Sequence, residues 1–145
     1  MKSFLAAWQF WALLSASFAA LTAIFAKVGV ENVNSDYATF VRTLVVIAAL
    51  AGVLSLTGQW QSPGTISTRS YLFLLLSGLG TGASWLCYFR ALKLGEAAKV
   101  APIDKLSVVL VALFGVAFLG ERLSALSWAG IALIATGAVM VAYAG

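Results

Sequence analysis

Five long apolar segments constrain this chain more than any other feature. They lie at about residues 4–26, 37–57, 71–92, 100–119 and 125–143, and the short stretches between them carry most of the charges and turn-forming residues. A helix needs ~20 apolar residues to cross the ~30 Å hydrocarbon core of a bilayer. At 62% hydrophobic and 10% charged residues, with a mean hydropathy of +1.00, the 145 residues cannot hide their apolar surface behind polar side chains. The sequence therefore predicts five transmembrane helices.

The fold class follows from the solvent. A bilayer offers no water to unpaired backbone groups, so only helices and closed barrels span it, and no stretch here alternates in the manner of a barrel strand. We expect an all-α membrane protein with a single transmembrane domain over residues 1–145. The first apolar run continues to Ala26, which is too long for a signal peptide, so we expect the first helix to remain in the protein.

Composition narrows the function classes. There is no histidine and one cysteine, Cys87, which argues against a His/Cys metal site within one chain and against an internal disulfide. The net charge of +4 comes from scattered basic residues, which fit contacts with anionic lipid better than binding of nucleic acid. No nucleophile with its base and no paired carboxylates are visible, so we expect no enzyme activity and no cofactor.

The fourth apolar segment carries an adjacent acid and base, Asp104 and Lys105, just after Pro102. Proline lacks an amide hydrogen and disfavours helix at the residue before it, so we expect the helix to begin or to kink close to the charged pair. With alternating crossings, the second and fourth helices start at the membrane face where the third ends. Arg42 and Arg90 should then lie at a depth similar to that of Asp104 and Lys105.

A charged side chain within a span raises the free energy unless it pairs with an opposite charge, faces a water-filled cavity or extends to the membrane interface. We hypothesise that Asp104 pairs with Arg42 or Arg90. The alternatives are that Asp104 merely caps its helix among wet headgroups and that Arg42 snorkels to the interface.

Two helices show polar or aromatic stripes. In the third segment four polar residues at spacings i, i+4, i+7 and i+11 share one helical face, namely Ser77, Thr81, Ser84 and Tyr88. They either line a pocket or donate hydrogen bonds to carbonyls of their own helix. In the first segment Trp8, Trp11 and Ser15 share one face, as a pocket wall or as interfacial anchors. The predicted substrate-binding residues are Trp11, Ser15, Arg42, Ser77, Thr81, Ser84, Tyr88, Arg90, Asp104 and Lys105.

The second half of the chain resembles a known repeat. The residues that carry the resemblance are Gly95 to Ala101, Leu106 to Leu119, Gly120-Glu121-Arg122-Leu123, Trp128-Ala129-Gly130 and Ile134-Ala135-Thr136-Gly137. Together they look like the C-terminal part of an EamA repeat, of the drug/metabolite transporter superfamily. The resemblance implies a multi-pass protein of the cytoplasmic (inner) membrane that passes small metabolites or drugs, with export favoured, through a cavity between helices.

Family members of the usual length resemble two inverted five-helix repeats, whereas this chain has one. We therefore expect a homodimer, which an inverted relation would make antiparallel. The membrane face that holds the N-terminus has three basic residues in its loops and helix ends, and the opposite face has four, or six when Arg42 and Lys105 are counted. Because this bias is weak, both orientations are expected, with the N-terminus outside as the alternative. Ser127, Gly130 and Gly137 share a face of the last helix, suited to dimer contacts or to packing within the chain.

The charges also bear on the substrate. Small multidrug transporters of the superfamily depend on a glutamate in the first helix, and this chain has none there. Asp104 is the acid left for coupling, and three basic groups near it favour an anionic or zwitterionic solute. The alternative function is a non-transporting membrane subunit or a lipid-carrier flippase partner, for which basic residues at one membrane face would be equally suitable.

Overall fold

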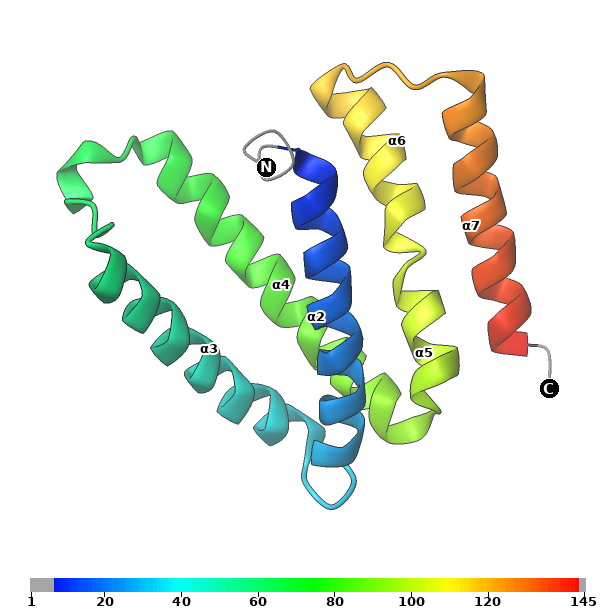
Figure 1. Ribbon diagram of the computed structural model, residues 1–145, viewed down its shortest axis with the longest axis horizontal. Coiled ribbons are helices and arrows are strands. Elements are labelled where there is room, and N and C mark those ends of the chain that lie inside the picture. The colour runs from blue at the N-terminus through cyan, green and yellow to red at the C-terminus, as the bar shows by residue number, and fades with distance from the viewer. Residues whose placement is uncertain (1–6, 144–145) are drawn as a thin grey trace. The chain divides into compact units, whose positions relative to one another are not determined.

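The computed structural model describes residues 7–143, which contain helices and no strand, and 84% of the chain is helical. The elements in chain order are α2 (Trp8–Gly29), α3 (Ser35–Thr57), the 3-10 turn η1 (Pro63–Thr65), α4 (Thr68–Leu94), α5 (Ala97–Asp104), α6 (Ser107–Leu119) and α7 (Ala125–Tyr143) (Figure 1). Five helical segments are long and apolar enough to cross a membrane, with α5 and α6 together forming the fourth. The all-α fold class with five spans is confirmed.

Several helix bounds differ from those expected. The start predicted for the first helix, at residue 4, lies outside the described residues, and its end comes at Gly29 rather than Ala26. The third helix begins at Thr68 and ends at Leu94, beyond both predicted limits. These extensions add hydroxyl, arginine and lysine residues, which can lie at the membrane surface while the backbone stays helical. The linkers are correspondingly shorter.

The fourth span begins earlier than expected and is interrupted. Helix α5 starts at Ala97, because a proline at the sixth position leaves the first turn of a helix intact. The helix then breaks two residues after Pro102. There the amide of Leu106 donates to the carbonyl of Ile103 at 3.0 Å and that of Val108 to Lys105 at 3.0 Å, which are tighter i to i+3 bonds. The kink that the sequence predicted is present, and the helix start it predicted near Pro102 is wrong.

The described chain forms two units. The hairpin unit is Ala26–Lys93 and holds the end of α2, all of α3 and nearly all of α4. The terminal unit joins the chain up to Phe25 with Leu94 and everything after it, so it contains most of α2 together with α5, α6 and α7.

In the terminal unit, α7 packs on α5 and, less extensively, on α6. Ala138 of α7 and Gly115 of α6 are buried. The side chain of Glu121, just past the end of α6, folds back over Gly115, and a Cβ on that glycine would lie 2.5 Å from Glu121 Oε2. Gly130 and Gly137, for which packing within the chain was one expectation, are not used in this way, because a Cβ on either would meet no atom within 4 Å.

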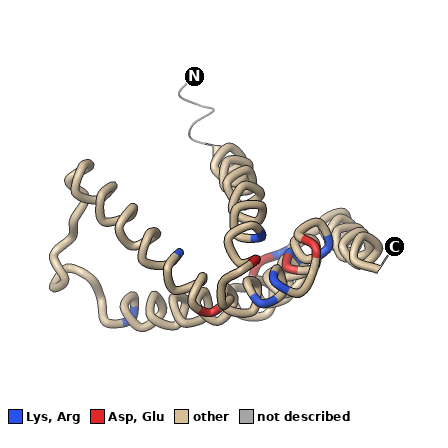
Figure 2. Tube along the Cα trace, turned by 90° about the horizontal axis from the view of Figure 1, so that it is seen from below, with Lys and Arg blue, Asp and Glu red and all other residues tan. Residues whose placement is uncertain are grey.

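Apolar side chains cover most of the described surface. The long helices carry few charges, and Figure 2 shows extended tan stretches along them. The buried apolar residues among those described are few, namely Ala23, Ala26, Val30, Phe89, Leu92 and Ala138. Large side chains such as Leu56, Leu133 and Phe118 are 90%, 74% and 79% exposed. In water this would be unstable, so lipid or a further protein surface must cover these faces.

Two glycines end helices where other residues fit poorly. Gly58 caps α3 with φ 64°, and Gly120 caps α6 with φ 69°, both in the left-handed region that a Cβ disfavours. In each case an amide after the helix bonds back into its last turns, from Gln59 to Leu54 at 3.1 Å and from Glu121 to Gly115 at 3.1 Å. Glycine is therefore required at these positions by conformation, not by lack of space.

We expect Gly58→Ala and Gly120→Ala each to lower the free energy of unfolding by about 1 kcal/mol, because an L-residue pays for left-handed φ. Gly64→Ala is the matched control, since Gly64 has open space and no positive φ. Denaturant titration of the purified protein in mild detergent measures the difference. Equal stability of Gly58→Ala and Gly64→Ala would contradict the assignment.

Candidate functional site

Three helix ends meet at one end of the hairpin unit, namely the end of α2, the start of α3 and the end of α4. Lys27 Nζ donates to the carbonyl of Leu92 at 2.7 Å, and Lys93 Nζ donates to the carbonyl of Val33 at 2.6 Å. Carbonyls in the last turn of a helix lack amide partners, so a lysine donor at Leu92 satisfies one of them. We call this region, with Lys27, Asp36, Arg42, Arg90 and Lys93, the basic end.

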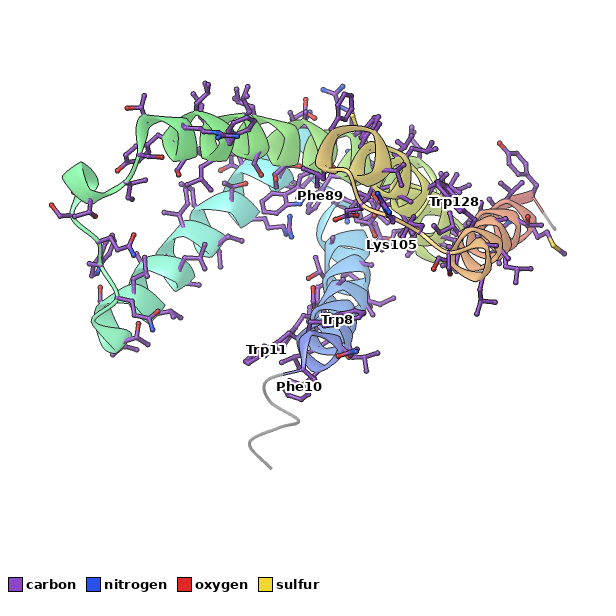
Figure 3. All side chains as sticks on the ribbon, turned by 90° about the horizontal axis from the view of Figure 1, so that it is seen from above. Trp8, Phe10, Trp11, Phe89, Lys105 and Trp128 are labelled. Atoms are coloured by element: carbon purple, nitrogen blue, oxygen red, sulfur yellow. The ribbon has the colours of Figure 1, made fainter. Side chains whose placement is uncertain are left out.

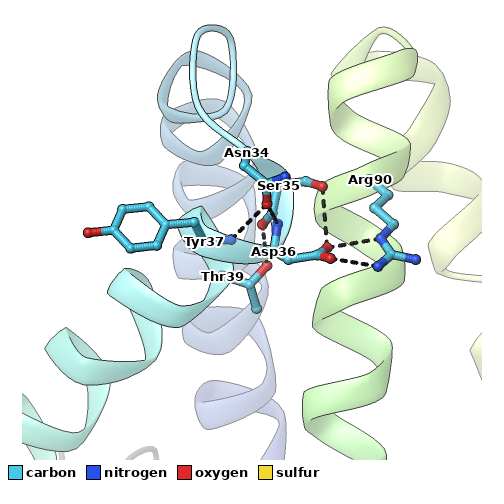
Figure 4. Close-up of polar contacts among 6 residues, drawn as sticks. All are labelled: Asn34, Ser35, Asp36, Tyr37, Thr39 and Arg90. Carbon is cyan, nitrogen blue, oxygen red and sulfur yellow. Dashed lines mark hydrogen bonds and ion pairs between the residues drawn. The ribbon is translucent and has the colours of Figure 1, made fainter.

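Asp36 and Arg90 form a bidentate ion pair at the basic end (Figure 4). Arg90 Nε donates to Asp36 Oδ1 at 2.9 Å and Arg90 Nη2 to Oδ2 at 2.6 Å. Two parallel bonds of this kind fix orientation as well as distance. The pair therefore holds the first turn of α3 level with the last turns of α4, although both side chains remain partly exposed.

The start of α3 is built to present Asp36. The side chain of Asn34 accepts hydrogen bonds from the amides of Asp36 at 2.9 Å and Tyr37 at 3.1 Å, which caps the helix as its residue type predicts (Figure 4). The hydroxyl of Ser35 donates to Asp36 Oδ1 at 3.4 Å. Thr39 Oγ1, buried one turn further on, donates to the carbonyl of Ser35 at 2.8 Å. An acid in the first turn also suits the positive end of the helix dipole.

Arg42 lies deeper and has an aromatic environment. Its guanidinium carbon is 4.0 Å from the ring centre of Trp85 and 5.5 Å from that of Phe89, both on α4. Six residues separate Arg42 from Asp36, which is ~9 Å along the helix, and Trp85 lies five residues, or ~7.5 Å, before Arg90. The guanidinium is closer to the deeper of its two rings. By these spacings the guanidinium lies beside side chains of α4, at about the depth of Arg42's own backbone. Snorkelling of Arg42 to the interface stays a prediction.

The predicted pairing of Asp104 with Arg42 or Arg90 is not among the ion pairs of the described residues. Asp36, not Asp104, is the acid that pairs with Arg90, which corrects that expectation. The reason is geometric, because α3 and α4 are antiparallel neighbours in the chain and place these two residues at the same level. In the terminal unit, Asp104 Oδ2 accepts a bond from its neighbour Lys105 Nζ at 3.0 Å. A pairing of Asp104 with Arg42 stays a prediction.

The polar stripe of α4 lies on the helix as expected. Thr81 Oγ1 donates to the carbonyl of Ser77 at 2.9 Å, which is the self-bonding alternative for that hydroxyl. Ser77, Thr81 and Ser84 are exposed, and Tyr88, further toward the basic end, is half-buried. A Cβ on Gly78 or Gly82 would meet no atom within 4 Å, so the close helix approach expected there is absent within residues 26–93. Pocket lining by the stripe stays a prediction.

The aromatic residues of α2 gather near its start. Trp8, Phe10 and Trp11 lie close together there (Figure 3), and the rings of Phe10 and Trp11 meet edge to face at 5.3 Å. Trp8 and Trp11 are 74% and 58% exposed, and Ser15 is exposed as well. This placement fits both the pocket wall and the interfacial anchor that the sequence left open.

Comparison with known proteins gives the family. Residues 6–143 match the EamA-like transporter family. The chain belongs to this family. It is thus a multi-pass membrane protein of a transporter family, as the resemblance implied.

Two relatives of this EamA chain differ in length. It is 64% identical over 135 residues to an "Uncharacterized transporter in cobO 3'region" from a Sinorhizobium species, covering 93% of this chain and 96% of the relative. It is 31% identical over 98 residues to an "Uncharacterized transporter" of Vibrio cholerae, covering 66% of this chain but only 32% of that protein. The Vibrio relative is therefore about twice as long. No solved structure matches the chain significantly.

Sequence reasoning missed several residues of the basic end of this EamA protein. Lys27, Asp36, Trp85 and Lys93 are not among the predicted substrate-binding residues. A signal for the Asp36–Arg90 pair was available, because consecutive antiparallel helices bring the start of one level with the end of the next. The stacking of Arg42 on Trp85 depends on helix rotation, which residue spacing does not supply.

The Asp36–Arg90 pair should contribute measurably to the stability of the hairpin unit. In a double-mutant cycle of Asp36→Asn and Arg90→Gln, we expect the double variant to be more stable than the sum of the single losses predicts, because either single change strands a charge. The matched control is the cycle of Glu96→Gln and Lys99→Gln, whose charged atoms are 3.8 Å apart at an exposed helix start. Thermal unfolding in detergent measures both. Equal coupling in the two cycles would contradict a structural role for Asp36.

Proposed function

We propose that this EamA chain exports small metabolites or drugs across the cytoplasmic membrane, where it is a multi-pass protein without enzyme activity. The family match over residues 6–143 carries this proposal. Five membrane-length helices, a span broken beside two charges, and an arginine within another span support it further. Charged residues and interrupted helices within spans are typical of solute pathways.

We propose further that the working form is a homodimer of single repeats, antiparallel if it follows the inverted halves of longer relatives. The lengths of the relatives support this. A Sinorhizobium relative has almost the length of this chain, whereas the Vibrio relative is about twice as long. Two copies of a five-helix repeat would supply what a fused protein holds in one chain, and would cover part of the exposed apolar surface.

The proposed substrate-binding residues remain those that the sequence indicated. In the hairpin unit they are Arg42, Ser77, Thr81, Ser84, Tyr88 and Arg90, and in the terminal unit Trp11, Ser15, Asp104 and Lys105. Besides its proposed role in binding, Arg90 is engaged with Asp36 and so holds α3 level with α4. Asp104 is the candidate for coupling to an ion, because it lies within the fourth span beside its break.

Export is tested by comparing the culture medium of cells that lack or carry the chain, using untargeted mass spectrometry. We expect at least one small metabolite to depend on the chain. Asp104→Asn should reduce its export about tenfold, the factor that ~1.4 kcal/mol of lost interaction gives. Glu31→Gln is the control, an exposed acid in the loop after α2. Properly inserted protein with no dependent metabolite would instead support the non-transporting subunit or flippase partner.

Orientation is tested with single cysteines in a Cys87→Ser background. Ser62→Cys lies in the loop between α3 and α4, and Asn32→Cys lies in the loop between α2 and α3, so the two occupy opposite membrane faces. In the proposed antiparallel dimer, an impermeant thiol reagent added to intact cells labels each variant in roughly half of the molecules. Full labelling of one variant and none of the other would exclude the antiparallel homodimer.

A further inference from the structure

The guanidinium of Arg42 lies over aromatic rings and makes no hydrogen bond to the residues that the structure describes. Stacking at 4.0 Å from the centre of the Trp85 ring occupies one side of the planar group. An arginine has five N–H donors, all directed outward in the plane of the group. A ring face offers no lone pair to such donors, so the contact with Trp85 leaves them available for an acceptor.

The acid nearest along α3 is already engaged. Both carboxylate oxygens of Asp36 accept bonds from Arg90. The three ion pairs among the described residues are Arg90–Asp36, Lys99–Glu96 and Lys105–Asp104, and none includes Arg42. A cation within a membrane span that has no carboxylate partner is costly, and such residues commonly serve a solute or ion pathway.

We propose that Arg42 binds the oxyanion of the transported solute, a carboxylate or a phosphate group, through two parallel N–H bonds. This inference rests on the proposed transport function and names its substrate class, a small organic anion. Trp85 holds the guanidinium plane in place, so that fewer degrees of freedom are lost on binding. The oxyanion supplies both the missing acceptors and the missing charge.

Depth favours a solute over a lipid headgroup as the source of this oxyanion. Headgroup phosphates lie at the interface, which is the level of the Asp36–Arg90 pair at the helix ends. Arg42 starts six residues further into the span and extends toward Trp85, ~7.5 Å below that level. A solute within the protein reaches this depth, whereas a lipid headgroup must leave the interface to do so.

The test uses purified protein in nanodiscs of phosphatidylcholine and phosphatidylglycerol, titrated with benzoate and phenyl phosphate and followed by tryptophan fluorescence. We expect at least one probe to bind saturably. Arg42→Gln should weaken binding at least about tenfold, and Arg42→Lys should weaken it less, because lysine keeps the charge but not the bidentate geometry. Arg69→Gln is the matched control, since Arg69 lies 5.9 Å from the Phe73 ring but in the first turn of α4.

The outcomes separate this inference from the function beneath it. No binding of either probe to the wild type, or equal binding by Arg42→Gln, overturns the role of Arg42. If Arg42→Gln fails to fold, Arg42→Lys decides, and unchanged binding by it overturns the bidentate contact. If the wild type keeps bound phospholipid after delipidation and Arg42→Gln does not, the oxyanion belongs to a lipid headgroup, and the solute contact is overturned. If cells carrying Arg42→Gln export the dependent metabolite as well as the wild type does, this inference alone is overturned. If cells carrying the wild type export no such metabolite, the transport function is overturned.

Discussion

The bilayer's inability to hydrogen-bond a backbone is the constraint on which the rest of this structure depends. It makes every span a helix and confines exceptions to helix ends and to one break. At the ends, Asn34 supplies acceptors to free amides, and Lys27 and Lys93 donate to carbonyls of Leu92 and Val33. At the break after Pro102, the backbone stays bonded through tighter turns.

Two arginines in one hairpin unit show how differently a cation can be accommodated. Arg90 lies near the end of α4 and forms two bonds with Asp36. Arg42 lies deeper, with its guanidinium over the Trp85 ring. The first arrangement fixes two helices relative to each other, and the second leaves a cation without a carboxylate partner among the described residues. This contrast is the basis for assigning positioning to one and solute binding to the other.

Prediction from sequence succeeded where a local rule applied. Apolar run length gave five spans and Pro102 gave a kink near Asp104, both of which the structure has. It was less accurate on helix ends, since hydroxyl and basic residues extend α4 at both limits. It also gave Arg90 the wrong acid, because charge type alone does not distinguish Asp36 from Asp104.

The sequence by itself determined that this EamA chain is an all-α membrane protein with five spans, because hydrophobic length and backbone hydrogen bonding are properties of single segments. Only the tertiary structure decided which charges meet. Whether Arg90 pairs with Asp36, and whether Arg42 lies over Trp85 or nearer the surface, depends on the level and rotation of α3 against α4. Those quantities arise from contacts between residues about fifty positions apart, which no periodicity within one helix encodes.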